Sequence, residues 1–438
     1  MRRVLASVVL LAALLAGGSA LAAPATPTVI VVQVAGPIDT VVEAYLLAAL
    51  ERAESEGATL AIQLDSPGTL DVEPVALATR IHEASVPVLV WVGPTPAEAA
   101  GAALLLVRAA SLAGVAPGAA VGPLLPLDVA RPAASEPGLD ATLARWASER
   151  GRTSPTAEPT EALPAQAAID AGLVEVAAPA ITDFLAAVDG RTVTTADGDA
   201  VLRTRVAVRE GESPVEVRFT SLGPWERILH ACATPSTIFL LLVVGFAAIA
   251  FEVTQPGFGF AGFSGIAALG LAVYGLTVVP WSVPGLALLV LGVGGLTADV
   301  ALRRLGWLSA IGIAGFLAGS ILAFRGVAPA IAISPWFLGG ATVASVLYYG
   351  FALTVAAQSR DRIVSAQQGL VGLVGEARTD LTPEGGVHVK GTMWRGRSTG
   401  GTIPAGTRIR VRGLDGLVLR VEAEPGAPLS VEDEEEEA

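Results

Sequence analysis

The chain has 438 residues, of which 52% are hydrophobic and 16% are charged, and its formal net charge is −13. A chain this apolar, with acids in excess of bases, is unsuited to a disordered or nucleic-acid-binding protein. It has one cysteine and three histidines, at positions 82, 230 and 388. They exclude an intramolecular disulfide and give no metal-ligand spacing, so neither a metal site nor a cofactor is expected.

The first residues are typical of an exported protein. Residues 1–22 combine Arg2 and Arg3 with a short apolar run and small residues at Ala20 and Ala22. This is the pattern of a cleaved secretory signal peptide, and an uncleaved membrane anchor is the alternative.

Residues 28–190 alternate apolar runs with amphipathic stretches. TVIVVQVAG, ATLAIQLD and VPVLVWVG have the composition of buried strands, and a helix is expected from Thr40 to Ser55 and another in VEPVALATRIHEAS. Apolar strands separated by helices predict an α/β domain with a parallel sheet covered on both faces. Residues 191–235 are predicted to form a linker and a small β region.

Residues 236–358 are predicted to be a transmembrane region of about five helices. Apolar segments lie near residues 237–253, 260–279, 284–302, 305–324 and 336–357, each close to the ~20 residues that span a bilayer. The charged residues between Thr237 and Gln358 are Glu252, Asp299, Arg303, Arg304 and Arg325. We interpret the two carboxylates as interfacial groups, and an ion path is the alternative.

The arginines predict the orientation of the chain. If the signal peptide exports the α/β domain, five helices place Arg303, Arg304, Arg360 and Arg362 on the cytoplasmic side, as the positive-inside rule requires. The C-terminal module is then cytoplasmic, and one helix more or fewer would reverse this. The expected location is the cell membrane, with several spans.

Residues 365–423 are predicted to form a small β-barrel. Short alternating strands are separated by turns at residues 383–386, 400–401 and 415–416. The tail, residues 424–438, ends in six acidic residues and is predicted to be disordered.

Several stretches together resemble one family, the long-form NfeD proteins. They are residues 34–70, residues 86–122 with VPVLVWVGPTPAEAAGAALLL and GVAPGAAVG, residues 149–175 with ERGR and QAAIDAGLVE, FEVTQPGFGFAGFSG at 251–265, and GLVGEARTDLTPEGGVHVKGTMWRG at 369–396. The resemblance implies an N-terminal ClpP-class, crotonase-like serine peptidase domain, a membrane region and a C-terminal OB-like barrel. It also implies self-association and a stomatin- or flotillin-like partner.

The family's peptidase activity implies a Ser–Lys dyad, which this sequence lacks. The nucleophile position falls on Gly101, which has no hydroxyl. The lysine is expected within residues 134–140, but the chain's one lysine is Lys390. The oxyanion turn is reduced to Gly68 and Thr69. We therefore predict a catalytically silent domain, because a serine needs a nearby base to become a nucleophile.

Other side chains are candidates to replace the dyad. His82 and Ser85 lie three residues apart on a helix, and Ser66 and Ser111 lie near the expected cleft, but none has an evident base in sequence. A cleft at Ser66, Pro67, Gly68, Gly101 and Ala102 is predicted to bind an extended apolar peptide by strand addition, and close packing of helix on sheet is the alternative.

The sequence thus predicts a membrane scaffold or adaptor with a degenerate peptidase domain. The alternative is an active membrane-bound protease with an unrecognised nucleophile. The barrel has a basic surface with one tryptophan, for which a protein partner ranks before lipid and nucleic acid; its residues are Trp394, Arg395, Arg397, Arg408, Arg410 and Arg412.

Overall fold

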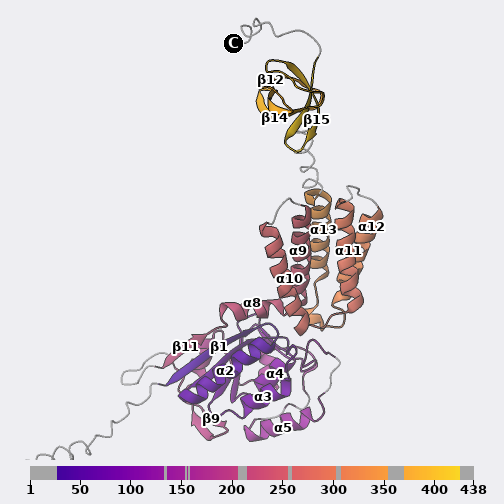
Figure 1. The fold of residues 1–438 in the computed structure, drawn as a ribbon. Helices are drawn as coiled ribbons and strands as arrows, with labels where there is room; N and C mark the ends of the chain where they lie inside the picture. Colours follow the sequence, from indigo (N-terminus) through magenta and orange to yellow (C-terminus); the bar gives the residue numbers. More distant parts are fainter. Residues whose placement is uncertain are drawn as a thin grey trace, which may run out of the picture. The chain divides into compact units, whose positions relative to one another are not determined.

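A computed structural model describes residues 27–132, 136–152, 155, 158–205, 215–254, 259–301, 307–353 and 369–424 (Figure 1). The predicted signal peptide lies outside the described residues, as does the acidic tail beyond Glu424.

The α/β domain is built on a parallel sheet of six strands in the order β11-β1-β2-β3-β5-β8. The strands are β1 (Thr28–Ala35), β2 (Thr59–Asp65), β3 (Val88–Val92), β5 (Leu112–Val115), β8 (Val176–Ala177) and β11 (Glu216–Thr220). Every residue of β3 and β5 is buried. Because alternate side chains point to opposite faces, both faces of the sheet centre are covered, as predicted.

Helices connect these strands. They are α2 (Thr40–Glu56), α3 (Pro74–His82), α4 (Ala102–Ala109), α5 (Leu139–Glu149), α6 (Ala165–Asp170) and α7 (Ile181–Val188). Asp39 caps α2 by accepting a hydrogen bond from the N–H of Val42, and Gly57 ends it in the left-handed conformation. A second, three-stranded sheet has the strand order β4-β6-β7. Its strands are β4 (Glu98–Ala99), β6 (Ala120–Val121) and β7 (Leu163–Pro164).

The region expected to be a linker differs from the prediction. Residues 191–235 do contain a small hairpin, β9 (Thr192–Thr195) with β10 (Gly198–Val201). They also supply β11, which joins the main sheet as an edge strand beside β1, and the amphipathic helix α8 (Pro224–Cys232). The reason is that the outer edge of β1 has unpaired backbone groups, which an extended segment satisfies.

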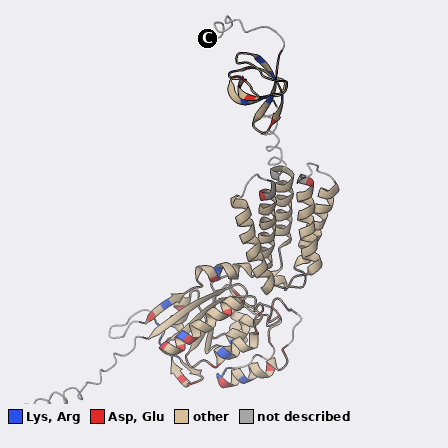
Figure 2. Ribbon diagram, viewed as in Figure 1, with Lys and Arg blue, Asp and Glu red and all other residues tan. Residues whose placement is uncertain are grey.

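Apolar helices occupy the predicted membrane region, and Figure 2 shows almost no charge along them. They are α9 (Pro235–Thr254), α10 (Phe260–Val278), α11 (Val283–Ala301), α12 (Trp307–Ala323) and α13 (Pro335–Leu347), with short helical segments at Pro329–Ile331 and Tyr348–Leu353. Within the described residues, three spans are long and apolar enough to cross a membrane: Pro235–Glu252, Phe260–Val278 and Pro329–Phe351. The apolar parts of α11 and α12 are shorter.

Two carboxylates cap the helices that follow them. Glu252, near the end of α9, accepts hydrogen bonds from the N–H groups of Gly259 at 2.5 Å and Gly262 at 3.1 Å, at the start of α10. Asp299, near the end of α11, accepts from the N–H and the hydroxyl of Ser309 in α12, both at 2.7 Å. A negative charge at a helix N-terminus satisfies unpaired N–H groups and interacts favourably with the helix dipole. These contacts give both carboxylates a structural role, and their position at the membrane interface stays a prediction.

The C-terminal domain is a closed barrel in the order β12-β13-β14-β16-β15. Its strands are β12 (Val374–Ala377), β13 (Glu384–Val389), β14 (Thr392–Ser398), β15 (Arg408–Asp415) and β16 (Val418–Ala423). Alternate residues fill the interior, among them Val387, Val389, Leu419 and Val421. The predicted fold class, an α/β domain followed by membrane helices and a small barrel, is confirmed.

The predicted basic surface of the barrel is largely neutralised. Arg395 and Arg397 both pair with Glu384, Arg412 pairs with Glu422 at 2.7 Å, and Arg410 pairs with Glu424. An arginine that is paired with a carboxylate neutralises a phosphate less well, so fewer counterions would be released from a nucleic acid on this surface.

Candidate functional site

The predicted oxyanion turn follows β2 and is buried. Ser66 is 1% exposed, and its hydroxyl lies 3.3 Å from both the N–H and the carbonyl oxygen of Gly68, accepting from the first and donating to the second. Gly68 has φ +132°, a conformation that L-residues rarely adopt. The N–H of Gly68 is therefore occupied by Ser66, and Ser66 serves the turn.

Gly101, at the predicted nucleophile position, precedes α4 with φ 55° and ψ −130°. A Cβ atom built there would overlap the carbonyl oxygen of Pro126 and lie 3.1 Å from that of Pro67. A side chain at position 101 is therefore opposed both by the backbone conformation and by its surroundings.

Residues 122–129 cover Gly101 and the turn. The N–H of Gly101 donates to the carbonyl of Pro123 at 2.8 Å. The carbonyl of Leu127 accepts from the N–H of Thr69 at 3.0 Å, from the Thr69 hydroxyl at 3.1 Å and from the N–H of Ala102 at 3.4 Å. The five predicted cleft residues thus come together, but the chain itself occupies the backbone donors that a peptide would need.

The lysine that the resemblance implies near residues 134–140 is not present in that stretch of the sequence. Lys390 follows β13 in the barrel. Asp128, which is 4% exposed, accepts from the guanidinium of Arg131 at 2.8 Å and from the N–H of Ala130 at 2.8 Å. A carboxylate held this way orders the loop and has no hydroxyl to activate.

Ser111 is part of a structural network centred on Arg150. The Arg150 guanidinium donates to the Ser111 hydroxyl at 3.0 Å, to the carbonyl of His82 at 2.7 Å and to the carbonyl of Thr194. Ser111 in turn accepts from the N–H of Val88 at 3.2 Å. Burial lowers the pKa of Arg150 to about 10, which leaves it charged at neutral pH.

His82 is paired with residues other than Ser85. Its ring stacks on Trp146 at a centroid distance of 5.1 Å, and Nε2 lies 2.7 Å from a carboxylate oxygen of Glu149. Burial lowers the pKa of His82, and the hydrogen bond to Glu149 opposes that shift. His82 therefore ties α3 to α5.

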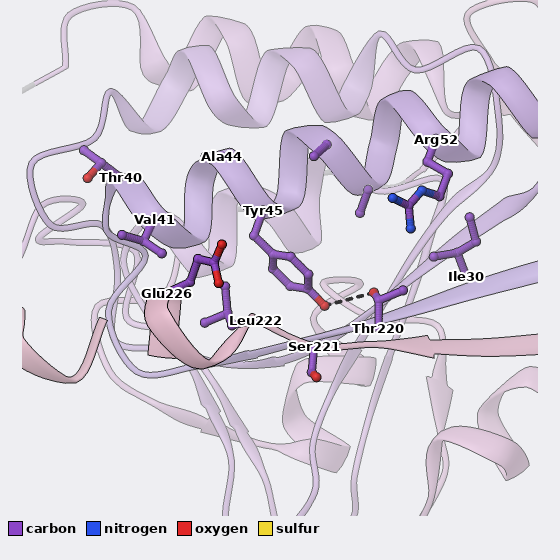
Figure 3. Close-up of a pocket in the computed structure, with 13 residues that line it drawn as sticks. Ile30, Thr40, Val41, Ala44, Tyr45, Arg52, Thr220, Ser221, Leu222 and Glu226 are labelled. Carbon is purple, nitrogen blue, oxygen red and sulfur yellow. Dashed lines mark hydrogen bonds between the residues drawn. The ribbon is translucent and has the colours of Figure 1, made fainter. Parts of the chain in front are cut away.

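A pocket lies elsewhere, between α2 and the segment that joins β11 to α8 (Figure 3). It has a volume of about 570 Å³, and Tyr45, Arg52, Ser221 and Glu226 are among its lining residues. The Tyr45 hydroxyl is hydrogen-bonded to that of Thr220 at 3.0 Å. The predicted cleft residues do not line this pocket.

A buried ion pair that sequence patterns did not indicate joins α2 to α8. Asp39 is 1% exposed, and its carboxylate lies 2.9 Å from Nδ1 of His230. Nε2 of His230 lies 2.9 Å from the carbonyl oxygen of Ala35. Because both ring nitrogens face acceptors, the protonated imidazolium fits best, and Asp39 raises the pKa of His230. The residues are 191 positions apart, so local spacing gives no signal.

Comparison with known protein families gives matches for the membrane region and for the C-terminal barrel. Residues 236–354 match the NfeD integral membrane domain, and residues 367–422 match the NfeD-like C-terminal, partner-binding domain. Membrane-bound protease PH1510 from Pyrococcus horikoshii is 26% identical over 396 residues, which cover 84% of this chain and 87% of that protein.

Solved structures are similar to the two ends of the chain. A membrane protease specific for a stomatin homologue, from Pyrococcus horikoshii, is 24% identical, with a TM-score of 0.39 over 47% of this chain and 98% of that one. The C-terminal domain of a stomatin operon partner protein from the same organism is 38% identical, with a TM-score of 0.13 over 14% of this chain and 95% of that one.

Proposed function

Because this chain has the long-form NfeD architecture, we propose that it is a membrane scaffold or adaptor with a catalytically silent peptidase-like domain. The observation that carries the proposal is the site at Gly101. A glycine there has no nucleophile, and the carbonyl oxygen of Pro126 occupies the space of a side chain. Loss of nucleophile and base together removes most of the rate enhancement of such enzymes.

The barrel is the proposed partner-binding part, and a stomatin- or flotillin-like membrane protein is its proposed partner. The match of residues 367–422 to a partner-binding domain supports this role. A shallow groove of about 360 Å³ is lined by Gly385, Gly386, Met393, Trp394 and their neighbours on β13 and β14. Met393 is 56% exposed, so we propose that an apolar segment of a protein partner packs against it in the groove.

The arrangement across the membrane belongs to the same proposal. The α/β domain is exported behind a signal peptide, and the barrel is cytoplasmic, in accordance with the arginines that flank the predicted helices. The α/β domain is proposed to self-associate and to bind an extended apolar peptide without cutting it.

A working protease is the second candidate, because the Pyrococcus horikoshii relative is named a membrane-bound protease. Its nucleophile would have to be another residue. Ser66 and Ser111 are the serines that the sequence places near the expected cleft. The hydroxyls of both form structural hydrogen bonds.

One experiment separates the two candidates. The full chain, purified in detergent, is incubated with a fluorophosphonate probe and separately with casein and apolar peptides, beside Ser66→Ala and Ser111→Ala variants. We expect neither labelling nor turnover. Labelling that disappears in one serine variant, together with turnover, would establish the protease and refute the scaffold.

A second experiment tests the partner. Tagged chain is copurified from membranes and the bound proteins are identified by mass spectrometry, with Met393→Asp as the groove variant. Leu417→Asp is the matched control, since Leu417 is 71% exposed in the β15–β16 turn. We expect a stomatin- or flotillin-like protein with wild type and the control, and its loss with Met393→Asp. Equal recovery with both variants would reject the groove.

A further inference from the structure

We propose that residues 122–129 are a built-in pseudoligand, a segment of the chain itself that pairs with Thr69, occupies the proposed peptide-binding edge of the α/β domain and is held there by the loop between α12 and α13. The inference rests on the proposed peptide-binding role of this domain. It adds that residues 122–129 close the site in this conformation and that the loop between α12 and α13 controls its opening.

The first observation is that the backbone of residues 68–70 is paired on both sides by other parts of the chain. On one edge, Ile38 donates to the carbonyl of Gly68 at 2.9 Å and accepts from the N–H of Leu70 at 2.9 Å. On the other edge, Thr69 forms a parallel bridge with Asp128. An incoming peptide can add to a strand only where backbone groups are free, so it must displace residues 127–129.

The second observation is the placement of the Leu127 carbonyl. It accepts from three donors, the N–H and hydroxyl of Thr69 and the N–H of Ala102. Two of these donors are backbone N–H groups on opposite sides of the site, one from the turn after β2 and one from the start of α4. A ligand carbonyl in this site would receive the same hydrogen bonds, so Leu127 imitates a bound peptide.

The third observation is that glycines make room for this segment. A Cβ at position 68 would lie 2.7 Å from the Leu127 carbonyl oxygen, and one at position 101 would overlap that of Pro126. The absence of a side chain at Gly101 therefore has a positive role, since any nucleophile there would expel the pseudoligand.

The side chains of the segment define what a competing ligand must resemble. Leu124, Leu127 and Val129 are 5%, 4% and 1% exposed, whereas Leu125 is 58% exposed. A competing peptide must be extended where it pairs with Thr69, must bury apolar side chains at the three equivalent positions, and must place a polar side chain where Asp128 is 4% exposed. The ligand class is thus an extended apolar peptide segment.

The fourth observation is that residues 122–129 are attached to the loop between α12 and α13. Val129 donates to the carbonyl of Thr69 at 2.9 Å and accepts from the N–H of Ala328 at 2.8 Å. Ala328 is 2% exposed and lies directly before the short helix Pro329–Ile331, between α12 and α13. Val129 is therefore fixed from both sides, and displacement of this loop frees the segment to leave Thr69.

The test removes that one hydrogen bond. Ala328 has φ −61° and ψ 149°, which a proline adopts without strain, so Ala328→Pro deletes the N–H and little else. Ala332→Pro is the matched control: Ala332 has φ −64° and ψ 147°, lies in the same loop, and donates to Pro329 and not to Val129.

Hydrogen exchange of the full chain in lipid nanodiscs measures occupancy without any ligand. In Ala328→Pro we expect the amides of Thr69 and of residues 122–129 to exchange about tenfold faster, and those of β1–β3 to stay protected. Thr69→Val, which removes the hydroxyl bond to Leu127, is expected to act in the same direction. Unchanged exchange in both variants, or equal acceleration in Ala332→Pro, would overturn the proposal.

Peptide binding then tests whether the freed edge accepts a ligand. The probe is the fluorescein-labelled hexapeptide copy of residues 124–129, measured by fluorescence anisotropy. We expect about tenfold tighter binding to Ala328→Pro than to wild type, and weaker binding of a copy that is N-methylated at the final valine. Equal affinities would refute the pseudoligand, and they would leave the scaffold proposal to its own copurification test.

Discussion

Replacing Gly101 by alanine is the most direct test of how the α/β domain closes over the predicted nucleophile position. At φ 55° and ψ −130° an L-residue is strained by about 1–3 kcal/mol. The new Cβ would also meet the carbonyl oxygen of Pro126, and overpacking of this kind costs about 1–3 kcal/mol. The two effects together predict a loss of about 4 kcal/mol from the free energy of unfolding.

Thermal unfolding of the full chain in detergent measures this loss. A domain of roughly 150–250 residues shifts its Tm by about 2–4 °C per kcal/mol, so Tm is expected to fall by about 10 °C. Trp91 and Trp146 are fully buried in the α/β domain and report its unfolding by fluorescence.

Gly138→Ala is the control for backbone strain alone. Gly138 has φ +83°, and no atom lies within 4 Å of the added Cβ. We expect this variant to lose about 1–2 kcal/mol. If Gly101→Ala were no less stable than Gly138→Ala, the close approach of Pro126 would be wrong, and so would our account of why a side chain is absent at position 101.

Three further outcomes are expected. Asp39 raises the pKa of His230. The stabilisation by this pair is therefore complete below the ordinary pKa of 6.5 and is lost as pH rises through the raised pKa. Over that pH interval the Tm of wild type should fall, and the Tm of His230→Gln should not. Asp299→Ala removes two hydrogen bonds from Ser309 and should lower stability against unfolding by dodecyl sulfate by about 3 kcal/mol, whereas an unchanged midpoint would contradict the cap. Arg150→Met leaves buried carbonyls unpaired and should cost about 3 kcal/mol in thermal unfolding, a loss that Arg150→Lys should not fully restore.

Local patterns were sufficient for the regular parts of the fold. TVIVVQVA, TLAIQLD and VLVWV form β1, β2 and β3, because continuous apolar runs suit strands buried on both faces. The apolar segments between residues 236 and 358 form helices, and the glycine-punctuated strands after residue 370 close into a barrel.

Local sequence patterns did not predict contacts between residues that are distant in the sequence. The pairing of Asp128 with Thr69 is made by backbone groups, which carry no side-chain signature. His82 and Ser85 lie close in sequence, yet the partners of His82 are Trp146 and Glu149, because burial of the ring between helices outweighs proximity. The sequence showed that position 101 has no hydroxyl. It did not show that residues 122–129 cover this position.

The caps made by Glu252 and Asp299 have a consequence for how the membrane region is able to change through evolution. Each carboxylate joins the end of one helix to the beginning of the next, so α9 with α10 and α11 with α12 are each complete as a two-helix hairpin. Duplication or deletion of a whole hairpin would therefore keep both of these junctions intact. A break between α9 and α10 would instead separate the Glu252 carboxylate from the N–H groups of Gly259 and Gly262.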